Sequence, residues 1–352
     1  MVLDALDECL DDLSYLLTLI SSTFSRVKWI VSSRNRCEIE EHLGRTESKL
    51  PLYLELNRKS VSRAVEYYIN YHTRQLELRK KLDNERARQV EIYLSRNAEG
   101  TFLWVALVLQ QLVNSKAWEI ESMLRLFPPG LNNLYKRMID QMRYSHSQEL
   151  YIRLLAIAST VFRPIKFSEL LTIEKSAMEK FGVKENMLPD VIAECGSFLT
   201  TRDNTIFFVH QSAKDFLVRD SSTLLFDSGL AQHHYLLFKQ SISILHKLDK
   251  DMYDLEYPGV SVEDAIRNCP EPDPLDGLRY ACVFWAEHLQ QAYQLFTQNE
   301  SEEGLPSIRP AHDFMAEKFL FWLEALTLSQ SLSAAGKALL FLKDLSAVSR
   351  VS

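Results

Sequence analysis

The alternation of apolar and polar residues predicts a mainly helical chain with a partial α/β sheet domain over residues 1–57. Residues 1–3 and 28–31 are short apolar runs that end in polar side chains, as strands of a buried parallel sheet do. Residues 13–20 lie between them and carry apolar side chains at helical spacing. Residues 50–56 alternate between apolar and polar, which favours a third strand.

Residues 58–145 predict a helical domain, because apolar residues there recur every three or four positions. Residues 100–112 are apolar around most of the helix circumference, and this predicts a largely buried helix. Residues 127–131 contain two prolines and a glycine that end this helical stretch. A new helix is then expected from Leu134 onward.

Residues 146–222 show the pattern of a winged helix, in which three helices precede a β-hairpin. The expected helices span residues 150–161, 167–175 and 187–195. Residues 197–209 are apolar, then polar around Asp203 and Asn204, then apolar again, which is the signature of a hairpin. The hairpin leads into residues 208–217, where a strand is expected to run into a helix.

Residues 223–352 predict helices throughout, apart from an irregular insert at residues 252–274. Residues 278–289 and 319–326 are amphipathic and rich in aromatic side chains, which is typical of helices that pack in a core. No stretch of roughly 30–50 residues resembles another, so we predict no repeat array in this chain.

Composition and charge exclude several classes of partner. The sequence is 46% hydrophobic and 25% charged, as in a soluble globular protein, and its net charge of −7 argues against general affinity for nucleic acid or an anionic membrane. Residues 146–220 hold nine basic and ten acidic residues, so the predicted winged helix lacks the basic face of a DNA-binding domain. We therefore expect protein partners or self-association, with no nucleic acid and no membrane.

Cysteine usage and the length of the apolar runs favour a cytoplasmic location. The five cysteines are odd in number and lack the spacing of a metal site or a disulfide framework, which predicts reduced thiols. The longest apolar stretch, residues 101–109, is too short for a membrane span, which needs ~20 residues. The first residues do not read as a secretory signal, because the apolar run ends at once in an acidic residue.

Acidic residues follow the first apolar run in a pattern typical of nucleotide hydrolases. Asp4 ends that run, and Asp7 and Glu8 come soon after it. In such enzymes the first carboxylate holds Mg²⁺ through water, and the next acids orient the attacking water. An acidic helix start that follows a strand produces the same letters, and this alternative remains open.

Residues 3–8, taken together with residues 28–35, resemble the NACHT family of signal-transducing nucleotide hydrolases and are most similar to its fungal, NLR-like members. In that family the first segment is the Walker B strand and the second is the sensor strand. Further phrases resemble the fungal members in the expected order, at residues 100–108, 128–138, 208–217, 278–289 and 319–326.

The resemblance implies a fold in four parts. Residues 1–57 would be a fragment of a P-loop NTPase domain, residues 58–145 a helical domain, residues 146–222 a winged helix and residues 223–352 a helical linker region. It also implies roles for the acidic residues: Asp4 would be the Mg²⁺ ligand, and Asp7 and Glu8 would be the catalytic acids.

Two further residues acquire roles from the resemblance. Arg34 would reach toward the terminal phosphate, and a surface arginine paired with Glu38 is the alternative. His210 would touch the diphosphate of the nucleotide and help to hold the inactive state. An ordinary structural histidine between a strand and a helix is the alternative there.

The phosphate-binding loop of the family, G-x-x-x-x-G-K-[ST], does not occur in the 352 residues. Intact relatives would bind Mg-ATP or Mg-GTP, but the amides and the lysine of that loop supply most of the positioning and charge stabilisation. We therefore expect an N-terminally truncated signalling protein that binds no nucleotide by itself and acts as an interaction or regulatory module. The alternatives are a fragment of an active switch whose loop is encoded upstream, and a site completed by a partner chain.

Overall fold

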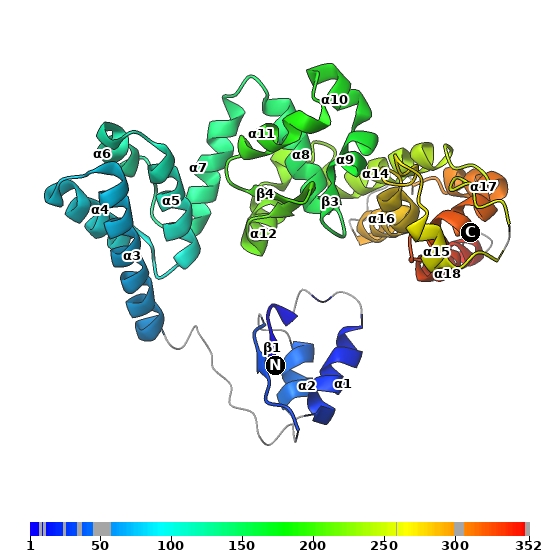
Figure 1. The fold of residues 1–352 in the computed structure, drawn as a ribbon, viewed down its shortest axis with the longest axis horizontal. Coiled ribbons are helices and arrows are strands. Elements are labelled where there is room, and N and C mark those ends of the chain that lie inside the picture. The colour runs from blue at the N-terminus through cyan, green and yellow to red at the C-terminus, as the bar shows by residue number, and fades with distance from the viewer. Residues whose placement is uncertain are drawn as a thin grey trace. The chain divides into compact units, whose positions relative to one another are not determined.

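The computed structural model describes residues 1–6, 9, 12–23, 26–33, 37–44, 58–257, 259–298 and 306–348. The described residues are mainly helical and form two small sheets, which confirms the predicted balance of helix and sheet (Figure 1). It divides into two compact units, Met1–Asn70 and Tyr71–Ser352, and each is described by itself. The finer division into four segments remains a prediction.

The first unit contains a short parallel sheet that is built as a strand–helix–strand crossover. Strand β1 (Val2–Leu3) pairs with β2 (Ile30–Val31) in the register Val2 to Ile30. Helix α1 (Leu13–Thr23) connects them, as parallel strands require, and packs against α2 (Cys37–Gly44). The core of this unit consists of Leu6, Leu13, Leu17, Ile20 and Ile39. The strand predicted at residues 50–56 lies outside the described residues.

The second unit opens with a group of helices that confirms the helical pattern after residue 58. These are α3 (Arg58–Lys80), which crosses from the first unit, α4 (Asn84–Asn97), α5 (Phe102–Asn114), η3 (Ala117–Glu119), α6 (Ile120–Leu124) and α7 (Leu131–Arg143). Two side chains bind the backbone of the segment at residues 127–131, where the helical stretch was predicted to end. Trp104 Nε1 donates to the carbonyl of Pro128 at 3.0 Å, and the Tyr93 hydroxyl donates to the carbonyl of Phe127 at 2.5 Å. Gly130 caps α7 with a φ of +77°, which favours glycine.

The segment from residue 148 to residue 220 contains both helices and strands. They are α8 (Gln148–Thr160), β3 (Ile165–Lys166), α9 (Phe167–Ile173), α10 (Lys175–Phe181), η4 (Glu185–Met187), α11 (Leu188–Ala193), β4 (Leu199–Arg202), β5 (Thr205–Phe208) and α12 (Gln211–Asp220). The three strands form an antiparallel sheet in the order β3-β5-β4. The predicted hairpin is confirmed, because Asp203 and Asn204 both take positive φ between β4 and β5, as a tight two-residue turn requires.

The helix predicted at residues 167–175 corresponds to α9, which ends at Ile173, and the separate helix α10 that follows it was not predicted. Glu174 leaves the helical conformation between them, with φ −100° and ψ 30°. Its carboxylate is held by Arg153 at 3.2 Å and by the amide of Gln240 at 3.2 Å. These contacts join the junction between α9 and α10 to Arg153 on α8 and to Gln240 on the later helix α14 (Gly229–Leu245).

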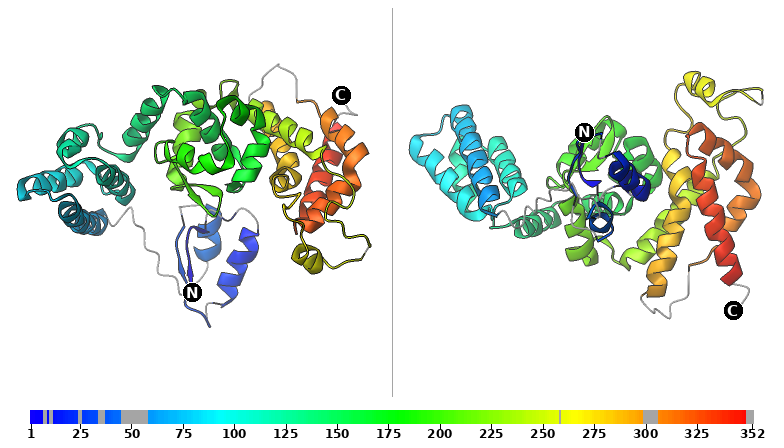
Figure 2. Two further views of the ribbon diagram at one scale, coloured as in Figure 1. Left: turned by 45° about the horizontal axis from the view of Figure 1, so that its top comes forward. Right: turned by 90° about the horizontal axis from the view of Figure 1, so that it is seen from below.

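The described residues after α12 form further helices, and two of these share a cluster of aromatic side chains. The further helices are α13 (Ser222–Leu225), α14 (Gly229–Leu245), α15 (Val262–Arg267), α16 (Arg279–Gln298), α17 (Arg309–Leu328) and α18 (Ser333–Val348). Helices α16, α17 and α18 run side by side (Figure 2). Trp285 on α16 meets Trp322 and Phe314 on α17 edge to face, and Trp322 Nε1 donates to the carbonyl of Cys282 at 2.8 Å.

The predicted irregular insert at residues 252–274 is wrong in one respect, because it contains helix α15. Ser261 precedes that helix, and its hydroxyl accepts the backbone N–H of Asp264 at 3.1 Å, which is a strong N-terminal cap.

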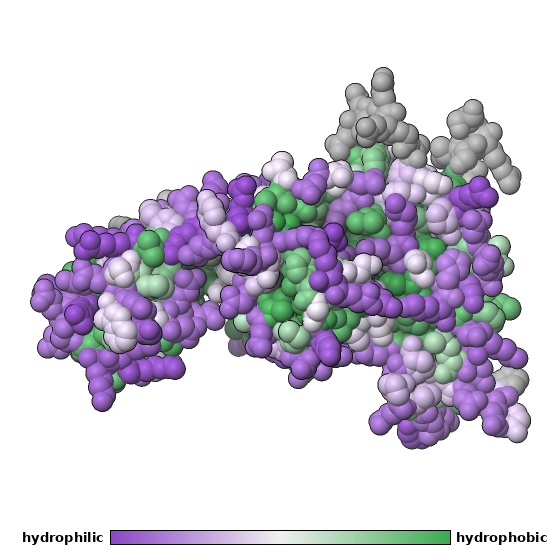
Figure 3. All heavy atoms as spheres, turned by 90° about the horizontal axis from the view of Figure 1, so that it is seen from above, coloured by the Kyte–Doolittle hydropathy of each residue, from purple (hydrophilic) through white to green (hydrophobic). Residues whose placement is uncertain are grey.

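On one face of the molecule, hydrophilic residues surround several smaller apolar patches (Figure 3). Within the described ranges, no helix combines the length and hydropathy needed to cross a membrane.

Candidate functional site

Asp4, the predicted metal ligand, lies directly after β1 and beside the end of β2. The parallel ladder continues past the strands, since Ser32 N–H donates to the carbonyl of Leu3 and Leu6 N–H donates to that of Ser32, both at 2.9 Å. The Ser32 hydroxyl donates to Asp4 Oδ1 and accepts the N–H of Ala5 at 2.9 Å. Both side chains are exposed at the carboxyl end of the sheet, the edge at which parallel sheets bind ligands.

The carboxylate and the hydroxyl fit the oxygen ligands that Mg²⁺ prefers, although Mg²⁺ at such sites also requires phosphate oxygens and water. The predicted catalytic residues Asp7 and Glu8 and the predicted phosphate contact Arg34 lie outside the described residues. Among the residues that the structure does describe, no group of three His, Cys, Asp or Glu side chains could hold a metal ion. The Mg²⁺ site therefore stays a prediction.

His210, the second predicted nucleotide contact, is the N-cap of α12 in the second unit. Its backbone is extended, and its Nδ1 accepts the backbone N–H of Ser212 at 3.1 Å. Just before it, the N–H of Val209 donates to the carbonyl of Phe198, which continues the hairpin to the start of the helix. The imidazole itself is exposed. The hairpin and the helix thus fix the side of the ring that carries Nδ1.

Two residues that sequence reasoning missed are joined to His210. The Ser212 hydroxyl lies 2.8 Å from His210 Nδ1 and 3.0 Å from the hydroxyl of Tyr135 on α7. Tyr135 is buried between Phe198 and Phe216, with ring centroids 5.4 and 5.3 Å away. Both residues stand inside phrases that carry the family resemblance, but their contact spans 77 positions and leaves no local signal.

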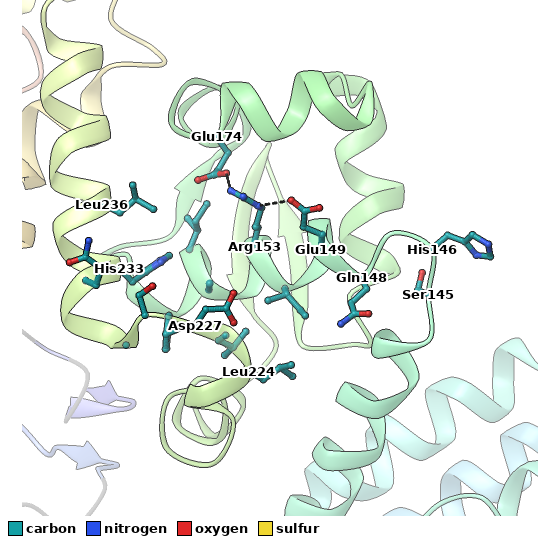
Figure 4. Close-up of a pocket in the computed structure, with 18 residues that line it drawn as sticks. Ser145, His146, Gln148, Glu149, Arg153, Glu174, Leu224, Asp227, His233 and Leu236 are labelled. Atoms are coloured by element: carbon teal, nitrogen blue, oxygen red, sulfur yellow. Dashed lines mark hydrogen bonds and ion pairs between the residues drawn. The ribbon is translucent and has the colours of Figure 1, made fainter.

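A cavity of about 790 Å³ opens between α8, residues 224–229 and the start of α14 (Figure 4). Arg153 lies on its wall and is shared by Glu149 at 3.4 Å and Glu174 at 3.2 Å. Burial, together with Arg153, lowers the pKa of His233 to about 4, so this wall histidine is neutral at pH 7. Because its arginine is already paired with two carboxylates, the cavity is poorly suited to a phosphate group.

Apart from this cavity, a buried cluster of polar side chains lies where α9 meets α14 and α16. Glu169 is fully buried, and its carboxylate accepts two bonds from Arg163, at 2.9 and 2.6 Å, and the backbone N–H groups of Lys166 and Tyr280 at 2.9 and 3.1 Å. All four hydrogen bonds stabilise the ionised carboxylate of Glu169. The carboxylate thereby joins the start of α9 to the start of α16.

Two buried histidines continue this cluster. His288 Nε2 lies 2.9 Å from the Tyr280 hydroxyl, and its Nδ1 lies 2.9 Å from His234 Nδ1. Burial is the main cause that lowers the pKa of His234 to about 4 and the pKa of His288 well below its usual value. Both rings are therefore neutral at pH 7. Their place in the core indicates a structural role.

Comparison with known proteins gives one informative similarity. The chain is 39% identical, over 363 aligned residues, to the Vegetative incompatibility protein HET-E-1 of Podospora anserina. The alignment covers 98% of this chain and 26% of that protein, so the chain is homologous to about a quarter of the relative's length. No protein-family model matches the chain. No solved structure matches it either.

Proposed function

We propose that the chain is part of a NACHT-type signalling protein and acts in vegetative incompatibility or a related signalling response. The observation that carries this proposal is the 39% identity with a vegetative incompatibility protein along 98% of the chain. The parallel pairing of β1 with β2 supports it, because Asp4 and Ser32 then share the sheet edge expected of Walker B and sensor strands. The order of helices and strands from α8 to α12 supports a winged helix.

In this proposal each predicted site residue has a defined task toward a nucleotide. A bound Mg-nucleotide would supply the phosphoryl chemistry. Asp4 would hold the Mg²⁺, and Asp7 and Glu8 would orient water. Arg34 and His210 would donate hydrogen bonds to phosphate oxygens, which is how arginine and histidine side chains stabilise phosphate charge.

The 352 residues by themselves would act as an interaction or regulatory module. They contain no G-x-x-x-x-G-K-[ST] loop, and carboxylates without such a cradle repel the phosphates of a nucleotide. An active switch that includes an upstream loop is the second candidate. The Asp4–Ser32 arrangement favours it, since this arrangement places the acid at the sheet edge that such a switch would use.

Protein partners or self-association fit the surface of the C-terminal helices. Leu320 on α17 is 73% exposed, and Leu340 on α18 is 63% exposed. Leu332 and Leu339, in the same part of the chain, are also exposed. Such side chains mark a surface that another protein chain covers only where they form a contiguous patch, because single exposed leucines are ordinary on monomeric proteins.

Melting experiments on a His210→Ala variant test whether a working nucleotide site exists in this chain. The substitution removes the cap of α12 and is expected to cost about 1 kcal/mol, which lowers the melting temperature modestly. We expect the same shift with and without millimolar ADP and Mg²⁺, because no diphosphate would be held. His312→Ala, which changes an exposed histidine on α17, serves as the matched control and should leave the melting temperature unchanged.

Stabilisation of the wild type by several degrees in ADP and Mg²⁺, with none for His210→Ala, would contradict the interaction-module proposal. It would favour the second candidate, an active switch, because only a bound nucleotide that touches His210 produces this difference.

A further inference from the structure

A continuous hydrogen-bonded chain links helix α7 to the exposed ring of His210. It runs from the Tyr135 hydroxyl to the Ser212 hydroxyl over 3.0 Å, and from there to His210 Nδ1 over 2.8 Å. The backbone N–H of Ser212 reaches the same nitrogen at 3.1 Å. Nδ1 thus meets two groups of one residue, and the other ring nitrogen, Nε2, has no hydrogen-bond partner among the described residues.

The backbone N–H of Ser212 can only donate, and this fixes which group donates and which accepts in each of these hydrogen bonds. A backbone N–H has no acceptor capacity, so Nδ1 must present its lone pair to Ser212 N–H. A neutral imidazole carries one hydrogen, which is then on Nε2. The Ser212 hydroxyl therefore donates to Nδ1 and accepts from Tyr135.

We propose that Tyr135 and Ser212 are positioning residues that hold His210 in the tautomer with its hydrogen on Nε2. The proposal rests on the proposed phosphate contact of His210 and states how that contact is made: Nε2–H donates to a phosphate oxygen. The opposite tautomer would turn a lone pair toward the anion and repel it. The two residues thus make the exposed nitrogen of His210 a donor.

Tyr135 can fix the direction of the hydrogen bonds to Ser212 and His210, because burial of its ring holds the phenol oxygen in place. The residue is 1% exposed, and its ring packs between Phe198 and Phe216. Burial is the main cause that raises the pKa of Tyr135, so its phenol keeps the hydrogen that Ser212 accepts. Since Tyr135 is on α7 and Ser212 is on α12, the donor state of His210 depends on the packing of these two helices.

Nitrogen-15 NMR of the full chain with labelled histidine tests this without any nucleotide. In the wild type at neutral pH, we expect the His210 signals to show an unprotonated Nδ1 and a protonated Nε2. Ser212→Ala keeps the backbone cap but removes the hydroxyl, and should shift the tautomer ratio toward Nδ1–H by about tenfold, the equivalent of one hydrogen bond. Tyr135→Phe should produce a smaller shift in the same direction. His210→Gln assigns the signals.

A double variant, Ser212→Ala with Tyr135→Phe, tests whether Tyr135 acts on His210 through Ser212 or independently of it. If Tyr135 acts through Ser212, adding Tyr135→Phe to Ser212→Ala should change the tautomer ratio no further. Tyr93→Phe is the matched control, since it removes a phenol that donates to a carbonyl elsewhere in this unit, and it should leave His210 unchanged. A merely structural role for Tyr135 would alter stability without moving the tautomer.

A wild-type spectrum with the hydrogen on Nδ1, or a ratio that neither Ser212→Ala nor Tyr135→Phe alters, would overturn the proposal. Because the spectra contain no nucleotide, this outcome is distinct from failure of the proposed phosphate contact. That contact fails instead if the expected tautomer is present and a longer protein with the phosphate-binding loop binds ADP equally with and without His210.

Discussion

Replacing Glu169 with alanine is expected to lower the free energy of unfolding by about 3–5 kcal/mol. The carboxylate is fully buried and accepts four hydrogen bonds, two of them from Arg163 and one from the backbone of Tyr280. Its removal leaves the Arg163 guanidinium without its counter-charge and two backbone N–H groups without acceptors. Urea denaturation followed by circular dichroism measures this loss.

Glu179→Ala is the matched control, because Glu179 pairs with Lys175 at 3.7 Å on the surface of α10 and both side chains are 67% exposed. Its effect should stay within about 0.5 kcal/mol. A loss below about 1 kcal/mol for Glu169→Ala would mean that this carboxylate does not join α9 to α16 as described.

Acidification is expected to destabilise the second unit between pH 6.5 and about 4. Folding lowers the pKa of His234 to about 4, and that of His288 well below the ordinary value of 6.5, mainly because both rings are buried. Below pH 6.5 the unfolded chain therefore binds protons that the folded chain does not, and stability falls as the pH falls. Each histidine contributes about 1.4 kcal/mol for every pH unit in this window, and the stability is fully present above it.

Urea titrations at several pH values measure this slope. His288→Gln removes one titrating ring and should reduce the slope by about 1.4 kcal/mol per pH unit, whereas exposed His312→Ala should leave it unchanged. Equal slopes for the wild type and His288→Gln would show that this ring is not held neutral by the fold.

The features that could be predicted from sequence are those with local causes. The turn at Asp203 and Asn204 needs two residues that accept positive φ, and the hairpin follows from it. The apolar period of residues 100–112 likewise gives α5, in which Trp104 is fully buried. Helix α15 was missed although Ser261 and Asp264 form a cap there, because that signal stands in a short polar segment.

The features that could not be predicted depend on contacts between distant residues. Tyr280 links Glu169 to His288, which in turn contacts His234, and nothing in the spacing of these residues indicates the cluster. Ser212 likewise acquires its role only when α7 brings Tyr135 to it. The roles of the site residues rest on the family resemblance, and those of Asp4, Asp7, Glu8, Arg34 and His210 all remain predictions.

Calorimetric titration of the chain with ATP, ADP and GTP in Mg²⁺ buffer tests the central claim most directly. We propose that these 352 residues correspond to the Walker B, sensor and winged-helix parts of a NACHT-type protein and do not bind nucleotide by themselves. We expect negligible heat of binding for all three nucleotides, for the wild type and for Asp4→Ala alike. A dissociation constant in the low micromolar range that Asp4→Ala weakens would contradict the claim, because Asp4 would then hold the Mg²⁺ of a nucleotide bound to this chain alone.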